Sequence, residues 1–138
     1  MEQEQILRIQ MIEQETNQLN EQLQMIEQTV AEMQQMNLSL DEIRDNKTDK
    51  IMVNLGRRIF VSVSIINKDF FVDVGKGHFI KKDIQETKRI VDDHAMQLIT
   101  SKTIIMDQLQ KLQNEIEEII HEVEKERSYS NKKRSFEE

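Results

Sequence analysis

The sequence predicts an α+β fold in which two long helices form an antiparallel coiled coil and are joined by two β-hairpins. Apolar residues recur at alternating steps of three and four on either side of the middle of the chain, which is the spacing of a coiled-coil seam. Residues 50–81 instead alternate apolar and polar side chains at period two and are rich in Val, Ile and Phe. All three glycines lie in that stretch, and the chain has no proline.

The first helix is predicted over residues 1–45. Outside its seam it carries mostly Gln, Glu and Asn, so it needs a partner helix to be stable. Thr16 is interpreted as a tolerated polar residue in the seam, whereas Asn37 either fixes the register or is tolerated in the same way. The segment Asp41–Asp49, dense in cap and turn residues, ends the helix. The seam consists of Ile9, Ile12, Thr16, Leu19, Leu23, Ile26, Val30, Met33, Asn37 and Leu40.

Four strands are predicted in the middle stretch, residues 50–81. Gly56 is expected to turn the first hairpin, and Gly75-Lys76-Gly77 the second. Asn67-Lys68-Asp69 connects the two hairpins. The strands are Lys50–Leu55, Ile59–Ile66, Phe70–Val74 and His78–Lys81.

One face of this β-region is almost wholly apolar. Two hairpins with four short strands are marginal without something packed on such a face, and the helices are too polar outside their own seams to cover it. We therefore expect sheets from other subunits to complete the β-region and to satisfy its open edges. The residues expected to carry this assembly are Ile59, Val61, Val63, Phe70 and Val72.

The second helix is predicted over residues 83–126. It has a capping-box-like start, in which Asp83 accepts from the backbone and Glu86 reaches back. Lys88 and Lys102 lie in its seam, and their charged heads are expected to reach water. The seam consists of Ile84, Lys88, Val91, Ala95, Leu98, Lys102, Ile105, Leu109, Leu112, Ile116, Ile119 and Val123.

Two helices of matching length that fold back on each other bring both chain termini together at a free tip. Apolar residues at this tip form a candidate contact surface, although scattered exposed apolar residues are also common without any role. Residues 127–138 are polar, mixed in charge and without a seam, so a disordered tail is predicted. Its basic run Asn131–Arg134 is interpreted as part of a solvated tail, with a nuclear signal or an RNA contact as the alternative. The tip residues are Ile6, Leu7, Met11, Ile120 and Val123.

Length and composition limit the class of protein. The chain has 138 residues and is predicted to form one domain, residues 1–125, followed by the tail. A net charge of -7 argues against nucleic acid or an anionic membrane as the main partner. No apolar run is long enough to span a bilayer and no signal-peptide pattern is present, so a soluble intracellular protein is expected.

No catalytic, metal or cofactor site is expected. The absence of cysteine excludes disulfides and thiolate metal sites. Gly75-Lys76-Gly77 lacks the remaining residues of a P-loop, so a hairpin turn is the better interpretation. The histidines, His78, His94 and His121, are not at ligand spacing from one another. Nothing resembles a catalytic constellation, and the protein is predicted not to be an enzyme.

Five short motifs of this chain, together with its layout, resemble a known family. The motifs are Val53-Asn-Leu-Gly56, Ile59-Phe-Val61, Phe71-Val-Asp-Val-Gly75, Gly77-His-Phe-Ile80 and Lys82-Asp83. They are similar to the subunits of prefoldin, specifically the α class, whose members carry two hairpins where the β class carries one. Val-Asn-Leu-Gly followed by Ile-Phe-Val also resembles the UXT-type prefoldin-like proteins.

The resemblance implies a hexamer of two α-class and four β-class subunits, whose hairpins form β-barrels from which the coiled coils hang. It implies a chaperone that works without ATP, holds unfolded client proteins at its tips and passes them to a group II chaperonin in the cytoplasm. In that case the tip residues contact clients and the hairpin residues carry assembly. One alternative is a UXT-like scaffold subunit, also nuclear, that binds transcription or assembly factors. Another is a homodimeric coiled-coil protein unrelated to chaperones.

Overall fold

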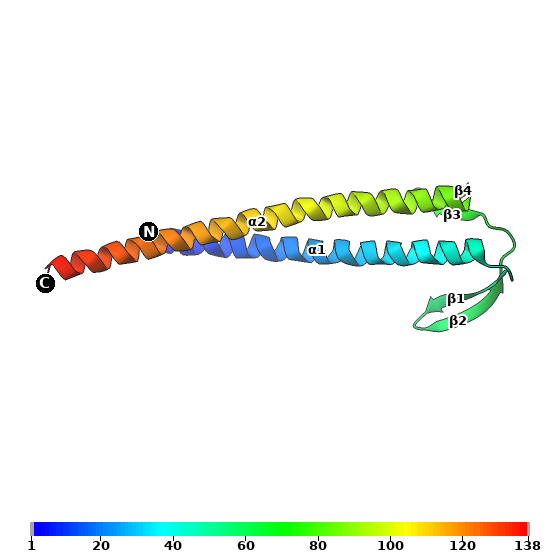
Figure 1. Cartoon of the computed structure of the whole chain (residues 1–138), viewed down its shortest axis with the longest axis horizontal. Helices are drawn as coiled ribbons and strands as arrows, with labels where there is room; N and C mark the ends of the chain where they lie inside the picture. Colours follow the sequence, from blue (N-terminus) through cyan, green and yellow to red (C-terminus); the bar gives the residue numbers. More distant parts are fainter. Residues whose placement is uncertain (1, 138) are drawn as a thin grey trace. The chain divides into compact units, whose positions relative to one another are not determined.

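The computed structural model describes residues 2–137, which form two long helices and four strands (Figure 1). The element order confirms the predicted α+β fold, with two helices joined by two hairpins. The chain divides into two compact units, one of Met1–Glu27 with Thr100–Glu138 and one of Gln28–Ile99. The elements are α1 (Glu2–Asp45), β1 (Lys50–Gly56), β2 (Ile59–Ser64), β3 (Phe70–Asp73), β4 (Phe79–Lys82) and α2 (Ile84–Glu137).

The two helices run antiparallel within each unit (Figure 1). In the first unit, Glu2 pairs with Arg127 and Glu27 pairs with Lys102, each at 3.3 Å. The number of residues from Glu2 to Glu27 on α1 equals the number from Lys102 to Arg127 on α2. The register of the pair is therefore regular over this length.

Both predicted seams are confirmed by the pattern of burial. Every seam residue on α1 and on α2 is at least partly buried, while most residues between them are exposed. The packing of the two seams therefore forms the core of the helical pair. Its most buried apolar side chains are Ile12, Leu40, Val91, Ile105 and Ile119.

The two seam lysines make ion pairs with acidic residues of α1. The sequence predicted only that their charged ends reach water, not that they have these partners. Lys102 Nζ lies 3.3 Å from Glu27 Oε1 in the first unit. Lys88 Nζ pairs with Asp41 Oδ1 in the second unit. An acidic residue on the facing helix compensates each charge, so the seam tolerates lysine at these positions.

Asn37 connects the helices in the second unit. Its side-chain Nδ2 donates to Asp92 Oδ1 at 2.6 Å, while its own Oδ1 is buried without a partner. A polar contact of this kind is satisfied in only one alignment, which favours the register role over simple tolerance. Thr16, in the first unit, lies instead beside Asn17 and Asn20 in a groove of about 650 Å³.

The two hairpins form separate two-stranded antiparallel sheets. Val53 pairs with Val61 in the first, and Val72 pairs with Ile80 in the second. The first turn differs from the prediction, because Gly56 lies at a register shift and the residues that turn the chain are Arg57 and Arg58. Both have positive φ angles, 50° and 64°, as the twist of a two-residue hairpin turn requires.

The ends of α2 differ in how well they could be predicted. Asp83 Oδ1 accepts a hydrogen bond from the backbone N–H of Glu86 at 2.8 Å, which confirms the Asp83 half of the predicted capping box. The Glu86 carboxylate lies instead 3.9 Å from Lys82 Nζ. The carboxyl end is a correction, since α2 continues to Glu137 where a disordered tail was predicted from residue 127. Those residues contain neither Gly nor Pro, and the cations of the last turns favour the negative end of the helix dipole. Residue 138 lies outside the described residues.

We predict that Asn37→Leu stabilises the helical pair while loosening its register. The substitution removes a buried oxygen without a partner and adds an apolar seam residue, so the free energy of unfolding should rise by about 1–2 kcal/mol. Thermal unfolding followed by circular dichroism measures this change. The control Asn114→Leu, at an exposed position, should change stability far less. A lower unfolding temperature for Asn37→Leu would contradict the predicted stabilisation.

Candidate functional site

The hairpins hold most of the chain's aromatic side chains. Four of its five phenylalanines lie in the strands. Phe60, Phe71 and Phe79 are 51%, 69% and 63% exposed. Because each described sheet has only two strands, each strand also has one edge without a backbone partner in its sheet. Exposed aromatic side chains beside open edges are the properties of a surface that associates with other chains.

The predicted assembly residues fall into two groups by burial. Ile59 and Val61 are exposed, whereas Val63, Phe70 and Val72 are partly covered within this chain. All five lie on the strands as expected. The structure places them on the hairpins, and their part in assembly stays a prediction.

Several exposed apolar residues of the hairpins were not among the predicted residues. Met52 and Phe60 lie on the face of the first sheet opposite Val61 and Val63. The prediction considered only the almost wholly apolar face, and this opposite face also carries the polar Ser62 and Ser64. The other missed residues are Leu55, Phe71, Val74, Phe79 and Ile80.

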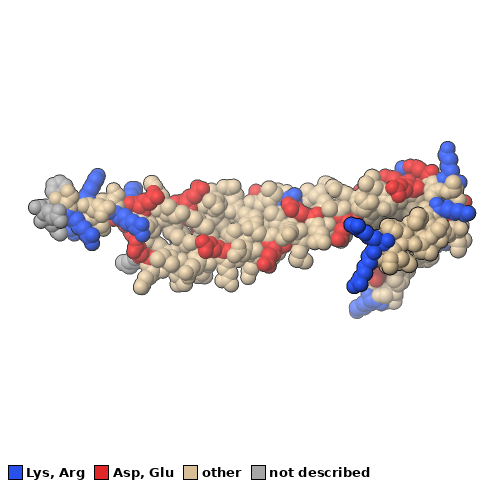
Figure 2. Space-filling model, turned by 90° about the horizontal axis from the view of Figure 1, so that it is seen from below, with Lys and Arg blue, Asp and Glu red and all other residues tan. Residues whose placement is uncertain are grey.

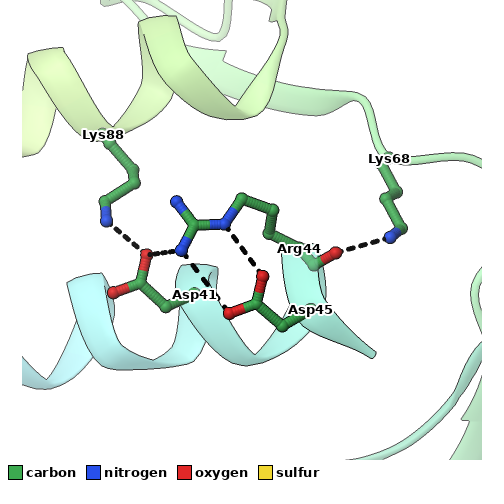
Figure 3. Close-up of polar contacts among 5 residues, drawn as sticks. All are labelled: Asp41, Arg44, Asp45, Lys68 and Lys88. Atoms are coloured by element: carbon green, nitrogen blue, oxygen red, sulfur yellow. Dashed lines mark hydrogen bonds and ion pairs between the residues drawn. The ribbon is translucent and has the colours of Figure 1, made fainter. Parts of the chain in front are cut away.

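A polar network lies where α1 ends and α2 begins (Figure 3). Asp41 Oδ1 accepts from Lys88 Nζ and lies 3.3 Å from Arg44 Nη2. Arg44 Nε also lies 3.1 Å from Asp45 Oδ1. Lys68, in the link between the hairpins, donates through Nζ to the backbone oxygen of Arg44 at 2.8 Å. A cation therefore satisfies a free carbonyl at the end of α1 and attaches the hairpin link to the helix.

The network shifts the pKa values of two of its side chains, Arg44 and Asp45. The hydrogen bond between the Arg44 and Asp45 side chains raises the pKa of Arg44 and lowers the pKa of Asp45 below its ordinary value. Nearby positive charge on Lys68 and Lys88 also lowers the pKa of Asp45, while desolvation opposes it. A lowered carboxyl pKa means that this contribution to stability is present at neutral pH and is lost as the carboxylate protonates in acid.

At the tip, the first unit has a small apolar groove between the helices. Its volume is about 260 Å³, and Ile6, Ile9, Ile120 and Val123 line it. The ion-paired residues Glu2 and Arg127 also belong to its lining. The start of α1 thus lies beside α2 at this tip as predicted, but it meets α2 at Arg127, and α2 continues beyond that contact.

The structure brings together three of the five predicted tip residues. Ile6, Ile120 and Val123 line the same groove, whereas Leu7 and Met11 do not. Leu7 and Met11 are 58% and 64% exposed, and their spacing of four residues places them on one face of α1. The tip therefore has a groove and a separate apolar pair on its outer surface.

The described residues offer neither a metal-binding cluster nor a membrane-spanning helix. Among residues 2–137, no group of three or more His, Cys, Asp or Glu side chains is arranged to hold a metal ion. No described helix is both long enough and apolar enough to cross a membrane.

A family comparison identifies the arrangement. The protein-family model with the description "Prefoldin subunit" matches residues 9–127 of this chain. The chain belongs to the prefoldin family. Prefoldin is a family of chaperone subunits rather than of enzymes. A search of curated proteins gives no significant match.

A solved structure supports the prefoldin fold. The cryo-EM structure of filamentous PFD from Methanocaldococcus jannaschii aligns with a TM-score of 0.72 and 17% sequence identity. The alignment covers 83% of this chain and 97% of the archaeal chain. At this identity the similarity shows that the two chains share the prefoldin fold.

We predict that Asp41 and Lys88 of this prefoldin chain are coupled. Asp41→Asn should lower the free energy of unfolding by about 0.5–1 kcal/mol, because Lys88 then lies partly buried without its carboxylate. In a Lys88→Leu background the same change should cost much less, since no lysine is then left without its carboxylate. Urea unfolding of the four proteins measures the difference, and equal costs in both backgrounds would contradict the coupling.

Proposed function

We propose that this chain is an α-class subunit of a hexameric, ATP-independent chaperone. Its hairpins associate with those of β-class subunits, and its tip holds unfolded proteins for transfer to a group II chaperonin in the cytoplasm. The observation that carries the proposal is the presence of two hairpins with exposed aromatic residues in a prefoldin chain. Two hairpins between the helices are also the feature that separates the α class from the β class.

The energetics of the hairpins support assembly. Phe60, Phe71 and Phe79 are each more than half exposed in the single chain. Burying one such side chain is worth about 1.5–3 kcal/mol, so a neighbouring sheet that covered them would gain several kcal/mol. Pairing of the open strand edges would add backbone hydrogen bonds and prevent unspecific aggregation.

The size of the tip groove supports weak binding of many clients. A groove of about 260 Å³ is smaller than an ordinary small-molecule site, which is about 300 Å³ or more. It suits one or two apolar side chains of an extended polypeptide. Leu7 and Met11 offer additional apolar area nearby on α1, and the flexible methionine adapts to different partners. Several such tips in one complex would raise the affinity for a client through multivalency.

The proposal predicts a separation between holding clients and assembling. In the complex reconstituted with β-class subunits, the triple variant Ile6→Ser, Leu7→Ser and Ile120→Ser should suppress aggregation of an unfolded protein less well. We expect the concentration required for half suppression to rise roughly tenfold, because about 0.5 kcal/mol of apolar contact is lost at each of the three positions. Light scattering of denatured citrate synthase diluted into buffer measures the effect.

The matched control removes exposed apolar residues of the other unit. The control variant carries Met36→Ser, Leu38→Ser and Ile90→Ser and should suppress aggregation as well as the wild-type complex does. Both triple variants should still assemble with the β-class subunits, as measured by native mass. An unchanged suppression by the tip variant would refute the assignment of the tip. If the wild-type complex assembles but never suppresses aggregation, the chaperone proposal is wrong and a scaffold subunit becomes the better explanation.

A further inference from the structure

Among residues 2–137, no other helix lies beside the last part of α2. Glu2, the first described residue of α1, pairs with Arg127, and α2 continues for residues 128–137 beyond this contact. At about 1.5 Å per residue this extension is about 15 Å long. It starts directly beside the tip groove, because Arg127 belongs to the groove lining.

The extension differs in charge from the rest of the chain. Residues 128–137 contain three Lys and Arg and one Glu, in a protein whose net charge is -7. Lys132, Lys133 and Arg134 are exposed, and none has an acidic partner among the described side chains. Figure 2 shows Lys and Arg side chains gathered toward the carboxyl end of α2. This cluster of three cations is called the basic extension below.

One exposed aromatic residue lies along α2 between the groove and the basic extension. Tyr129 is 73% exposed and lies one turn before Lys132 and Lys133. Arg134 follows the groove residue Arg127 by seven residues, or about two turns, and therefore lies on the same side of α2 as the groove. Beyond the apolar groove, this end of α2 therefore carries exposed positive charge. An extended polypeptide with apolar residues followed by acidic residues is complementary to it in both respects.

We propose that the basic extension binds acidic segments of unfolded clients, so that this tip prefers clients in which acidic residues lie close to apolar ones. The inference rests on the proposed client binding at the tip. A nucleic acid fits less well, because Glu122, Glu124 and Glu126 lie along α2 before the cations, and Glu126 is only about 9 Å from Lys132 along the helix axis, close to the distance over which charges act in physiological salt. Those carboxylates would repel a long polyanion, whereas a short acidic segment can contact the extension alone.

The test uses the assembled complex and two fluorescent unfolded peptides. The peptides share one apolar segment, followed in one by four Glu and in the other by four Gln. The variant Lys132→Gln, Lys133→Gln and Arg134→Gln keeps good helix formers and removes the charge. We expect the dissociation constant for the acidic peptide, measured by anisotropy, to rise about three- to tenfold, with no change for the neutral peptide. Added salt should weaken only the acidic peptide's binding to the wild-type complex.

The control Lys47→Gln, Arg89→Gln and Lys111→Gln makes the same change in net charge at exposed positions elsewhere. It should bind both peptides as the wild-type complex does. If the wild-type complex and the variant of the basic extension bound the acidic peptide with equal affinity, the inference would be overturned while the proposed function stands. Binding of neither peptide by the wild-type complex would overturn both. A single-stranded RNA that binds more tightly than the acidic peptide, and only with the cations present, would overturn it in favour of nucleic acid.

Discussion

The fold depends on the packing of one apolar seam against another. Neither helix could be stable alone, because its surface outside the seam is mostly Gln, Glu and other polar residues. Burial of the seam residues within each unit therefore supplies most of the stabilisation. The ion pairs that join the helices are largely exposed and contribute little each, so their main effect is on alignment.

This use of apolar residues has a consequence for the hairpins. The helices place their apolar residues in the seam, and little apolar surface remains to cover two small sheets. The strands keep exposed aromatic residues and open edges as a result. Two-stranded sheets with such a surface are marginal unless another chain covers them, so the same property that makes the isolated hairpins weak suits them to assembly.

Much of the fold could be predicted because its signals are local and periodic. The seams, the four strands and the Asp83 cap each follow from residues close together in the sequence. The network at Asp41 could not be predicted in this way, since Lys88 is 47 residues away and is placed by the antiparallel register. The Arg57-Arg58 turn lacks the Asn or Gly that usually marks positive φ angles.

The candidate site was predicted in part. Ile6, Ile120 and Val123 could be assigned to one place because matched helices bring the chain ends together, but the separation of Leu7 and Met11 depends on their exact angle around α1. The helical extension was missed because polar composition predicts disorder, while the same Lys, Arg and Glu residues are good helix formers. Composition alone does not decide between these outcomes.

The most direct test of the account is the native mass of this chain, first alone and then mixed with β-class prefoldin subunits from the same source. The account predicts a complex that contains two copies of this chain and four partner subunits. A defined homodimer that does not join the β-class subunits would contradict it.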